Sequence, residues 1–182
     1  MFTTIFSKKP RFRISKSQYY ETVTTGNTYL QNIASNADVI NNTDFVTKAP
    51  IFFNNTLSLN SSYQEVIDCF GTPAHQVDKN TANQHSILFY KKKVGIHKVR
   101  LEIHVVNQQF IIGFITFSLT SQKEKSPVID SISEEYQINR AKNHLEDFRI
   151  YNEKNEFIKV IDSVDLTLVY WSNTESNNQL LQ

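Results

Sequence analysis

The segment from 57 to 73 constrains the fold more than any other, because it holds a complete helix signal directly ahead of a strand-like region. Ser62 and Glu65 have the spacing of a capping box, in which each side chain satisfies the other residue's main-chain donor. Gly71 stands where helices commonly end, and Pro73 prevents continuation. The apolar positions recur at helical spacing: Tyr63, Val66, Ile67 and Phe70. We predict a helix there that serves as scaffold and contains no reaction centre.

Three strands are predicted after this helix, over about 86–92, 96–106 and 110–119. From Lys98 to Val105 polar and apolar residues alternate, so Lys98, Arg100, Glu102 and His104 share one face. The strand that begins at Phe110 is apolar on both faces. It therefore either lies centrally between two covering layers or offers its second face to a partner. The polar segment 74–85 predicts a loop between the helix and the first of these strands.

The remaining patterns predict helices over about 28–38 and 127–146 and further strands over about 51–53, 148–151, 157–161 and 164–171. Together they indicate an α+β fold, with an antiparallel sheet of about four to six strands and two or three helices packed mainly on one face. We expect a single domain over residues 1–182, with a basic N-terminal arm at 1–18 and a polar C-terminal tail at 172–182.

Composition narrows the class and the compartment. Hydrophobic residues make up 40% of the chain, which is typical of a folded protein and not of a disordered one. Cys69 is the only cysteine, so no disulfide can form within the chain, and a reducing compartment fits best. The first residues lack the pattern of a signal peptide, and the longest apolar run is about half of what a spanning helix needs. We therefore expect a cytoplasmic protein without a transmembrane segment.

Part of the chain is similar to a known module. The residues concerned are Leu57-Ser58-Leu59-Asn60-Ser61-Ser62-Tyr63, Glu65-Val66, Phe70-Gly71-Thr72-Pro73, Tyr90 and the hairpin at 98–118. This order resembles the small α/β module shared by the SmpA/OmlA outer-membrane assembly lipoproteins and the β-lactamase-inhibitory-protein-like (BLIP-like) domains. The resemblance covers roughly 57–118, about a third of the chain. It implies an antiparallel sheet with helices on one face, and a role in binding other proteins instead of catalysis.

Chemistry-bearing residues do not assemble into a recognisable site in the sequence. Cys69 and His75 are the one conceivable nucleophile–base pair, and packing explains the cysteine better. His97 and His104 are seven apart on one strand, so they point to opposite faces and cannot share a metal ion. With four glycines in the chain, no phosphate-binding loop occurs. We therefore predict no catalytic, cofactor-binding or metal site.

Basic and aromatic residues provide the candidate contacts. Protein interfaces favour aromatic residues and arginine, and Tyr170 and Trp171 stand at the end of the last strand, either as exposed anchors or as core residues. The full candidate set is Tyr170, Trp171, Tyr90, Lys91, Lys92, Lys93, Lys98 and Arg100. We expect a non-catalytic protein-binding module, such as an inhibitor or an immunity-type neutraliser of a toxin. The alternative is an adaptor that binds nucleic acid or an anionic surface through basic clusters 8–16 and 91–100, although the sequence pI of about 7.8 is below that typical of nucleic-acid-binding domains.

Overall fold

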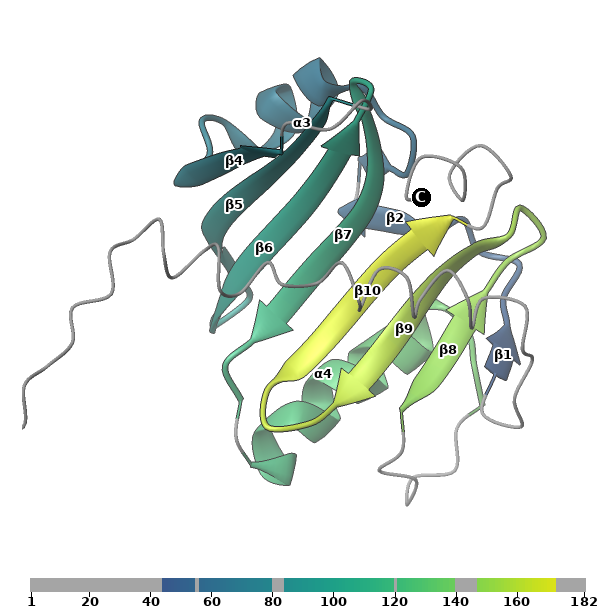
Figure 1. Ribbon diagram of the computed structural model, residues 1–182. Coiled ribbons are helices and arrows are strands. Elements are labelled where there is room, and N and C mark those ends of the chain that lie inside the picture. The colour runs from purple at the N-terminus through teal and green to yellow at the C-terminus, as the bar shows by residue number, and fades with distance from the viewer. Residues whose placement is uncertain (1–43, 55, 80–83, 120, 140–146, 173–182) are drawn as a thin grey trace, which may run out of the picture.

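An eight-stranded sheet dominates the fold (Figure 1). The computed structural model describes residues 44–54, 56–79, 84–119, 121–139 and 147–172. The elements in chain order are β1 (Asp44–Val46), β2 (Phe52–Asn54), β3 (Leu57–Ser58), α3 (Tyr63–Phe70), β4 (His75–Lys79), β5 (His85–Val94), β6 (His97–Val106), β7 (Gln109–Phe117), α4 (Gln122–Glu135), β8 (Phe148–Tyr151), β9 (Glu156–Asp162) and β10 (Leu166–Ser172). The large sheet has the order β1-β8-β9-β10-β7-β6-β5-β4, and β2 pairs with β3 in a small second sheet.

The helix predicted after Ser62 is confirmed with both of its ends. The Ser62 hydroxyl accepts a hydrogen bond from the Glu65 main-chain N–H at 3.2 Å, and the Glu65 carboxylate accepts one from the Ser62 N–H at 2.6 Å. At the other end Gly71 has a φ of 74°, and its N–H donates to the Ile67 carbonyl at 2.7 Å. Main-chain bonds between Tyr63 and Gln108, at 2.8 Å, attach the start of α3 to the β6–β7 turn. Local capping therefore determines where this helix lies over the sheet.

Two antiparallel meanders build the large sheet. In the first, β4, β5, β6 and β7 pair in chain order, and in the second β8, β9 and β10 do so. A helix precedes each meander, α3 the first and α4 the second. The meanders join at their last strands, β7 and β10, which run antiparallel with Leu166 opposite Phe117 and Trp171 opposite Ile112. We call this β7–β10 pairing the seam.

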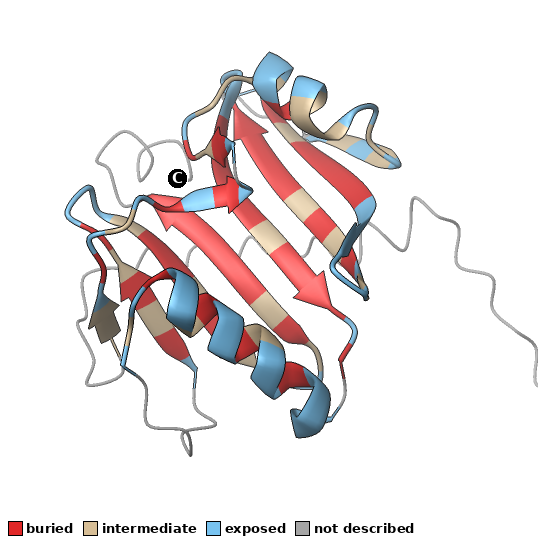
Figure 2. Cartoon of the chain, turned by 180° about the vertical axis from the view of Figure 1, so that it is seen from behind, coloured by how far each residue is buried: buried red, intermediate tan, exposed pale blue. Residues whose placement is uncertain are grey.

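Each face of the large sheet carries a buried apolar cluster, and both described helices lie on the same face. We call this helix-covered side the core face, and Figure 2 shows α4 and the small sheet lying across it. Leu101, Ile115 and Leu168 belong to its apolar cluster, together with Val66 of α3 and Ile129 of α4. The opposite side, the outer face, has its own buried cluster: Val106, Ile111, Ile112, Phe157, Val169 and Trp171. The second apolar face of β7 is therefore buried and not an open contact surface.

The small sheet is attached to the core face through a glycine. Gly113 lies in the middle of β7, and a Cβ atom there would approach Cε2 of Phe53 to 2.3 Å. The missing side chain lets the Phe53 ring lie directly against the strand, where it makes edge-on contacts with Phe110 and Tyr170, each with ring centroids 5.1 Å apart. Such edge-to-face contacts between aromatic rings are favourable. Phe53 thus fixes β2 and β3 over the centre of the sheet.

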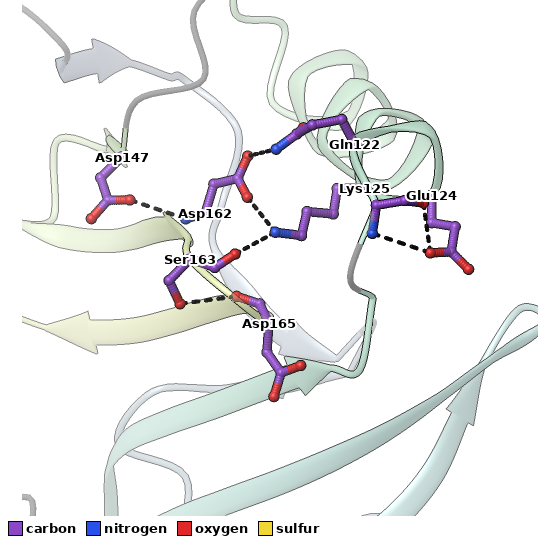
Figure 3. Close-up of polar contacts among 8 residues, drawn as sticks. Gln122, Glu124, Lys125, Asp147, Asp162, Ser163 and Asp165 are labelled. Atoms are coloured by element: carbon purple, nitrogen blue, oxygen red, sulfur yellow. Dashed lines mark hydrogen bonds and ion pairs between the residues drawn. The ribbon is translucent and has the colours of Figure 1, made fainter.

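A buried ion pair holds the start of α4. The Lys125 ammonium lies 2.7 Å from the Asp162 carboxylate, with both side chains almost fully buried. It also donates to the Ser163 carbonyl, and the Gln122 amide donates to the second Asp162 oxygen at 3.0 Å (Figure 3). Glu124 accepts hydrogen bonds from the Ser121 N–H and hydroxyl, so the helix begins at Gln122. The observed helix therefore starts five residues before the predicted start at Pro127.

The predicted fold class is wrong, because the described part of the chain is mostly sheet. The sheet has eight strands instead of four to six, and it is mixed, because β1 pairs in parallel with β8. A separate two-stranded sheet is added, and the described residues contain two short helices. The expected loop at 74–85 holds β4, an edge strand whose polar sequence gives no strand pattern. The helix predicted over 28–38 and most of the arm and tail lie outside the described residues. Within the described residues, no helix has the length and apolarity needed to cross a membrane.

Candidate functional site

The end of the β5–β6 hairpin collects positive charge on one face. Register places Lys91 opposite Arg100 and Lys93 opposite Lys98. Directly opposite residues share a face, and so do residues two apart on one strand. All four side chains therefore belong to the outer face, and we call them the basic patch. They line a surface hollow of about 660 Å³ together with Lys92, Val99 and Ser118.

Lys92 does not belong to this patch, although it is the central residue of the lysine run. Its neighbour across the ladder is Val99, a core-face residue. The Lys92 ammonium donates to the Phe70 carbonyl at 2.8 Å and lies 5.9 Å from the ring centroids of both Phe70 and Tyr90. It thus binds the carbonyl end of α3, where the helix dipole favours a cation. The expected group of three lysines is divided between the two faces of the hairpin.

The three lysines of the basic patch carry exposed positive charge. Like charges directly opposite on neighbouring strands repel, so the facing pair of Lys93 and Lys98 weakens the hairpin that holds it. Lys91, Lys93 and Lys98 are exposed, and none of them forms an ion pair with another described residue. Their charges are therefore available to an anionic group from outside the chain.

An apolar tip adjoins the patch. Gly95, with a φ of 57°, makes the turn between β5 and β6. The next residue, Ile96, is 90% exposed, and Val94 on the other side of the turn is 46% exposed. A single exposed apolar residue is ordinary on a protein surface. Two of them at a hairpin end beside four cations make a mixed surface, which the sequence pattern did not reveal.

The aromatic candidates are placed away from this surface. Tyr170 and Tyr90 belong to the core face, and Trp171 belongs to the outer-face cluster; their exposed fractions are 6%, 2% and 0%. Both faces of β10 are covered, because Tyr170 packs in the core-face cluster and Trp171 packs in the outer-face cluster. The expected exposed anchor at Tyr170 and Trp171 is therefore replaced by core packing. Neither the Tyr90 hydroxyl nor the Trp171 indole N–H has a hydrogen-bond partner among the described residues.

A buried polar chain lies further along the outer face. The His85 ring meets the His104 ring, with Nε2 and Nδ1 3.0 Å apart, and His104 Nε2 lies 2.9 Å from the Glu102 carboxylate. With both rings neutral, His104 donates from Nε2 to Glu102 and accepts at Nδ1 from His85. Sequence pattern alone does not indicate these polar contacts, because the meeting of the two rings depends on the β5–β6 register, which places Ile87 opposite His104. No group of three or more metal-ligating side chains occurs in the described segments.

The structure does not bring Cys69 and His75 together. The Cys69 thiol accepts a hydrogen bond from the Asn54 amide at 3.3 Å and packs on the core-face cluster. His75 lies opposite Phe89 on β5, and its ring centroid is 6.2 Å from that of Phe89, which belongs to the outer face. The sheet therefore separates the thiol from the imidazole. Basic cluster 8–16 lies outside the described residues.

Comparison with protein-family models, with curated proteins and with solved structures gives no match to this chain. The functional interpretation therefore rests on the described residues alone.

Proposed function

We propose that this chain is a non-catalytic protein-binding module that docks an acidic partner protein on the end of its β5–β6 hairpin. In its most specific form, the partner is a toxin or enzyme that the chain neutralises. The observation that carries the proposal is the combination of the basic patch with the apolar tip at Val94 and Ile96.

The charges support an anionic partner. Lys91, Lys93 and Lys98 keep their ammonium groups in water without an ion pair among the described residues, and Lys93 faces Lys98 directly across the ladder, where like charges repel. A partner carrying carboxylates would relieve this repulsion and speed association, because complementary potentials steer the encounter of two proteins.

The apolar tip supports a protein in preference to a nucleic acid. Protein interfaces have an apolar centre within a polar rim, and Ile96 offers such a centre beside Lys93 and Lys98. Single-stranded nucleic acids bind instead on exposed aromatic rings among cations. The aromatic candidates Tyr90, Tyr170 and Trp171 are buried, so they do not offer that surface.

The experiment reverses the charge of two lysines of the basic patch and compares the result with the same charge change at two lysines elsewhere. We expect Lys93→Glu/Lys98→Glu, and separately Ile96→Ser, to abolish capture of the partner from cells that express this chain, read by mass spectrometry at two salt concentrations. With the partner purified, the double variant should weaken binding at least about tenfold, or about 1.4 kcal/mol. The control is Lys123→Glu/Lys154→Glu, which makes the same change in net charge at two exposed lysines of α4 and the β8–β9 turn.

Three outcomes would contradict the proposal. The first is capture that survives both hairpin variants, and the second is equal loss in the control. The third is capture that nuclease treatment abolishes, together with steeply salt-dependent binding to an oligonucleotide, which would identify a nucleic-acid adaptor. Neutralisation is tested separately by adding the chain to the captured partner and measuring that partner's activity, which should fall.

A further inference from the structure

A second hollow lies on the core face, beside α4. It measures about 480 Å³, which is within the usual range of roughly 300–1,000 Å³ for small-molecule sites. Figure 2 shows α4 and the small sheet on this face, and both contribute residues to the lining. Its lining comes from β2, the β5–β6 turn, β7, α4 and β10: Phe52, Phe53, Asn54, Val94, Gly95, His97, Ile115, Phe117, Pro127, Val128, Ser131, Ile132, Glu135, Leu168 and Tyr170.

The lining is apolar and aromatic over most of its area. Ile115 and Phe117 of β7, with Leu168 of β10, are buried core-face residues. The rings of Phe53 and Tyr170 stand nearly perpendicular to each other, with an interplanar angle of 83°. Phe52 is 39% exposed, so an aromatic ring of the lining is also open to water. Such a surface binds an apolar body, and its rings attract a cation placed over their faces.

The charge in the lining is negative. Glu135, near the C-terminal end of α4, is the one lining residue besides His97 whose side chain is ionisable and charged at neutral pH. Glu135 is an exposed residue whose carboxylate lies beside the Tyr136 hydroxyl, and it forms no ion pair with another described residue. The lysines nearest in sequence to Val94 and Gly95, the residues of the β5–β6 turn that line the hollow, do not face the hollow. Lys93 and Lys98 belong to the outer face, and Lys92 binds the Phe70 carbonyl.

We infer that this hollow binds a small organic cation, namely a primary amine with an aromatic or branched aliphatic body. The body packs among Phe53, Phe117 and Tyr170, and the ammonium group meets the Glu135 carboxylate and the exposed Phe52 ring. Pairing an ammonium with both a carboxylate and aromatic faces is an arrangement that recognises such cations, and here both groups are open to water at the edge of the hollow. The basic patch, which takes an anionic partner, lies on the opposite face, although Val94 of the apolar tip also lines the hollow.

The test uses three probes of one shape and different charge: phenethylamine, phenethyl alcohol and phenylacetate. Binding to the full chain is measured by calorimetry, and the site is located by chemical-shift changes at the methyl groups of Val128, Ile115 and Leu168. We expect the amine to bind most tightly and phenylacetate least tightly. Glu135→Gln should weaken amine binding about tenfold and leave the alcohol unchanged, while Glu134→Gln, an exposed neighbour outside the lining, should change neither.

A filling variant makes the test independent of charge. Ser131 is an exposed α4 residue in the lining, so Ser131→Trp fills the hollow without disturbing the core, and binding of all three probes should be lost. The inference is overturned if phenylacetate binds as tightly as the amine, or if Glu135→Gln leaves amine binding unchanged. It also fails if Ser131→Trp leaves amine binding intact, or if the amine shows no binding up to millimolar concentration. None of these results depends on the hairpin variants, so this inference and the docking proposal can fail separately.

Discussion

The structural role of a single residue in this chain depends on its packing environment as well as on its type. Gly113 is the clearest case, because its absent side chain is replaced by the ring of Phe53. In the interior of a strand, alanine is ordinarily better than glycine, since it lowers the entropy of the unfolded chain and packs more surface. Whether Gly113→Ala stabilises or destabilises the protein therefore tests whether the Phe53 ring occupies this space.

We expect Gly113→Ala to lower the free energy of unfolding by about 2 kcal/mol, as overpacked cores typically do. The new Cβ would meet Phe53 Cε2 at 2.3 Å and Phe110 Cζ at 2.9 Å, so the small sheet must lift from β7. Urea unfolding measures the change through its midpoint at constant slope. The pair Gly113→Ala/Phe53→Leu should be less destabilised than the sum of the single changes. Strict additivity, or a stabilised Gly113→Ala variant, would show that the ring does not occupy this space.

Residue composition predicted the presence of a basic cluster but not its geometry. Strand alternation places Lys92 on the opposite face of the hairpin from Lys91 and Lys93. For Tyr170 and Trp171 the sequence left open an exposed anchor or core packing, and only the apolar clusters on the two faces of the sheet show that both are buried. The His85–His104 contact likewise requires a register between two strands. Sequence periodicity indicates which residues share a face, whereas the layers packed on that face decide whether it meets water.

At the scale of elements, α4 depends on a long-range ion pair more than on its own sequence. Lys125 lies in the first turns of the helix and pairs with Asp162 at the end of β9, with the two side chains 4% and 3% exposed. Removal of one member of a buried pair leaves the other charge without its partner in a medium of low dielectric, which is more costly than removal of both.

Lys125→Met should therefore destabilise the protein by about 3 kcal/mol, and Lys125→Met/Asp162→Asn should recover most of that loss. Urea midpoints for the two variants measure the difference. Lys123→Met, at an exposed position two residues earlier, is the control and should fall within about 0.5 kcal/mol of the parent chain. A double variant as unstable as the single one would show that the Ser163 and Gln122 contacts, and not the ion pair, hold this end of α4.

The elements that the sequence predicted best are those whose signals are local. The helix at Tyr63–Phe70 carries its capping box, apolar stripe and terminal glycine within a dozen residues, and β6 carries its full alternation. The strands of the large sheet that were missed, β1 and β4, lie at its two edges and are identified by pairing alone, as is the short β3 of the small sheet. In α4 the capping residues Ser121 and Glu124 stand before a more conspicuous Ser126-Pro127, which displaced the expected start.

For the whole molecule, three tyrosines link stability to alkaline pH. Burial raises the pKa of Tyr90 to about 12, with smaller contributions from Tyr63 and Cys69. Burial also raises the pKa of Tyr136 and that of Tyr170, and the nearby Glu135 carboxylate adds to both. An unfolded chain releases these phenolic protons near pH 10. The stability contributed by keeping these phenols protonated is therefore complete below about pH 10 and is lost as the pH rises toward 12, by roughly 1 kcal/mol for each tyrosine at about pH 11.

Tyr90→Phe isolates one of these contributions. The Tyr90 hydroxyl has no hydrogen-bond partner among the described residues, so the variant should match the parent chain at neutral pH. Between about pH 8 and about pH 11 it should lose roughly 1 kcal/mol less than the parent does, because lysine titration is common to both chains. Urea unfolding at the two pH values measures this difference. An identical alkaline loss in both chains would contradict the shifted Tyr90 pKa.

The seam between β7 and β10 also governs how the chain can assemble. Each meander pairs strands that are neighbours in sequence, whereas the seam brings Leu166 to Phe117 across the whole of α4. Contacts that close long loops form late, so the two meanders can fold first and dock last. Until they dock, β7 exposes an unpaired edge that the β10 of a second copy fits as well as its own. The central pairing is thus also the natural point for domain swapping, with the segment that leads into α4 as the hinge.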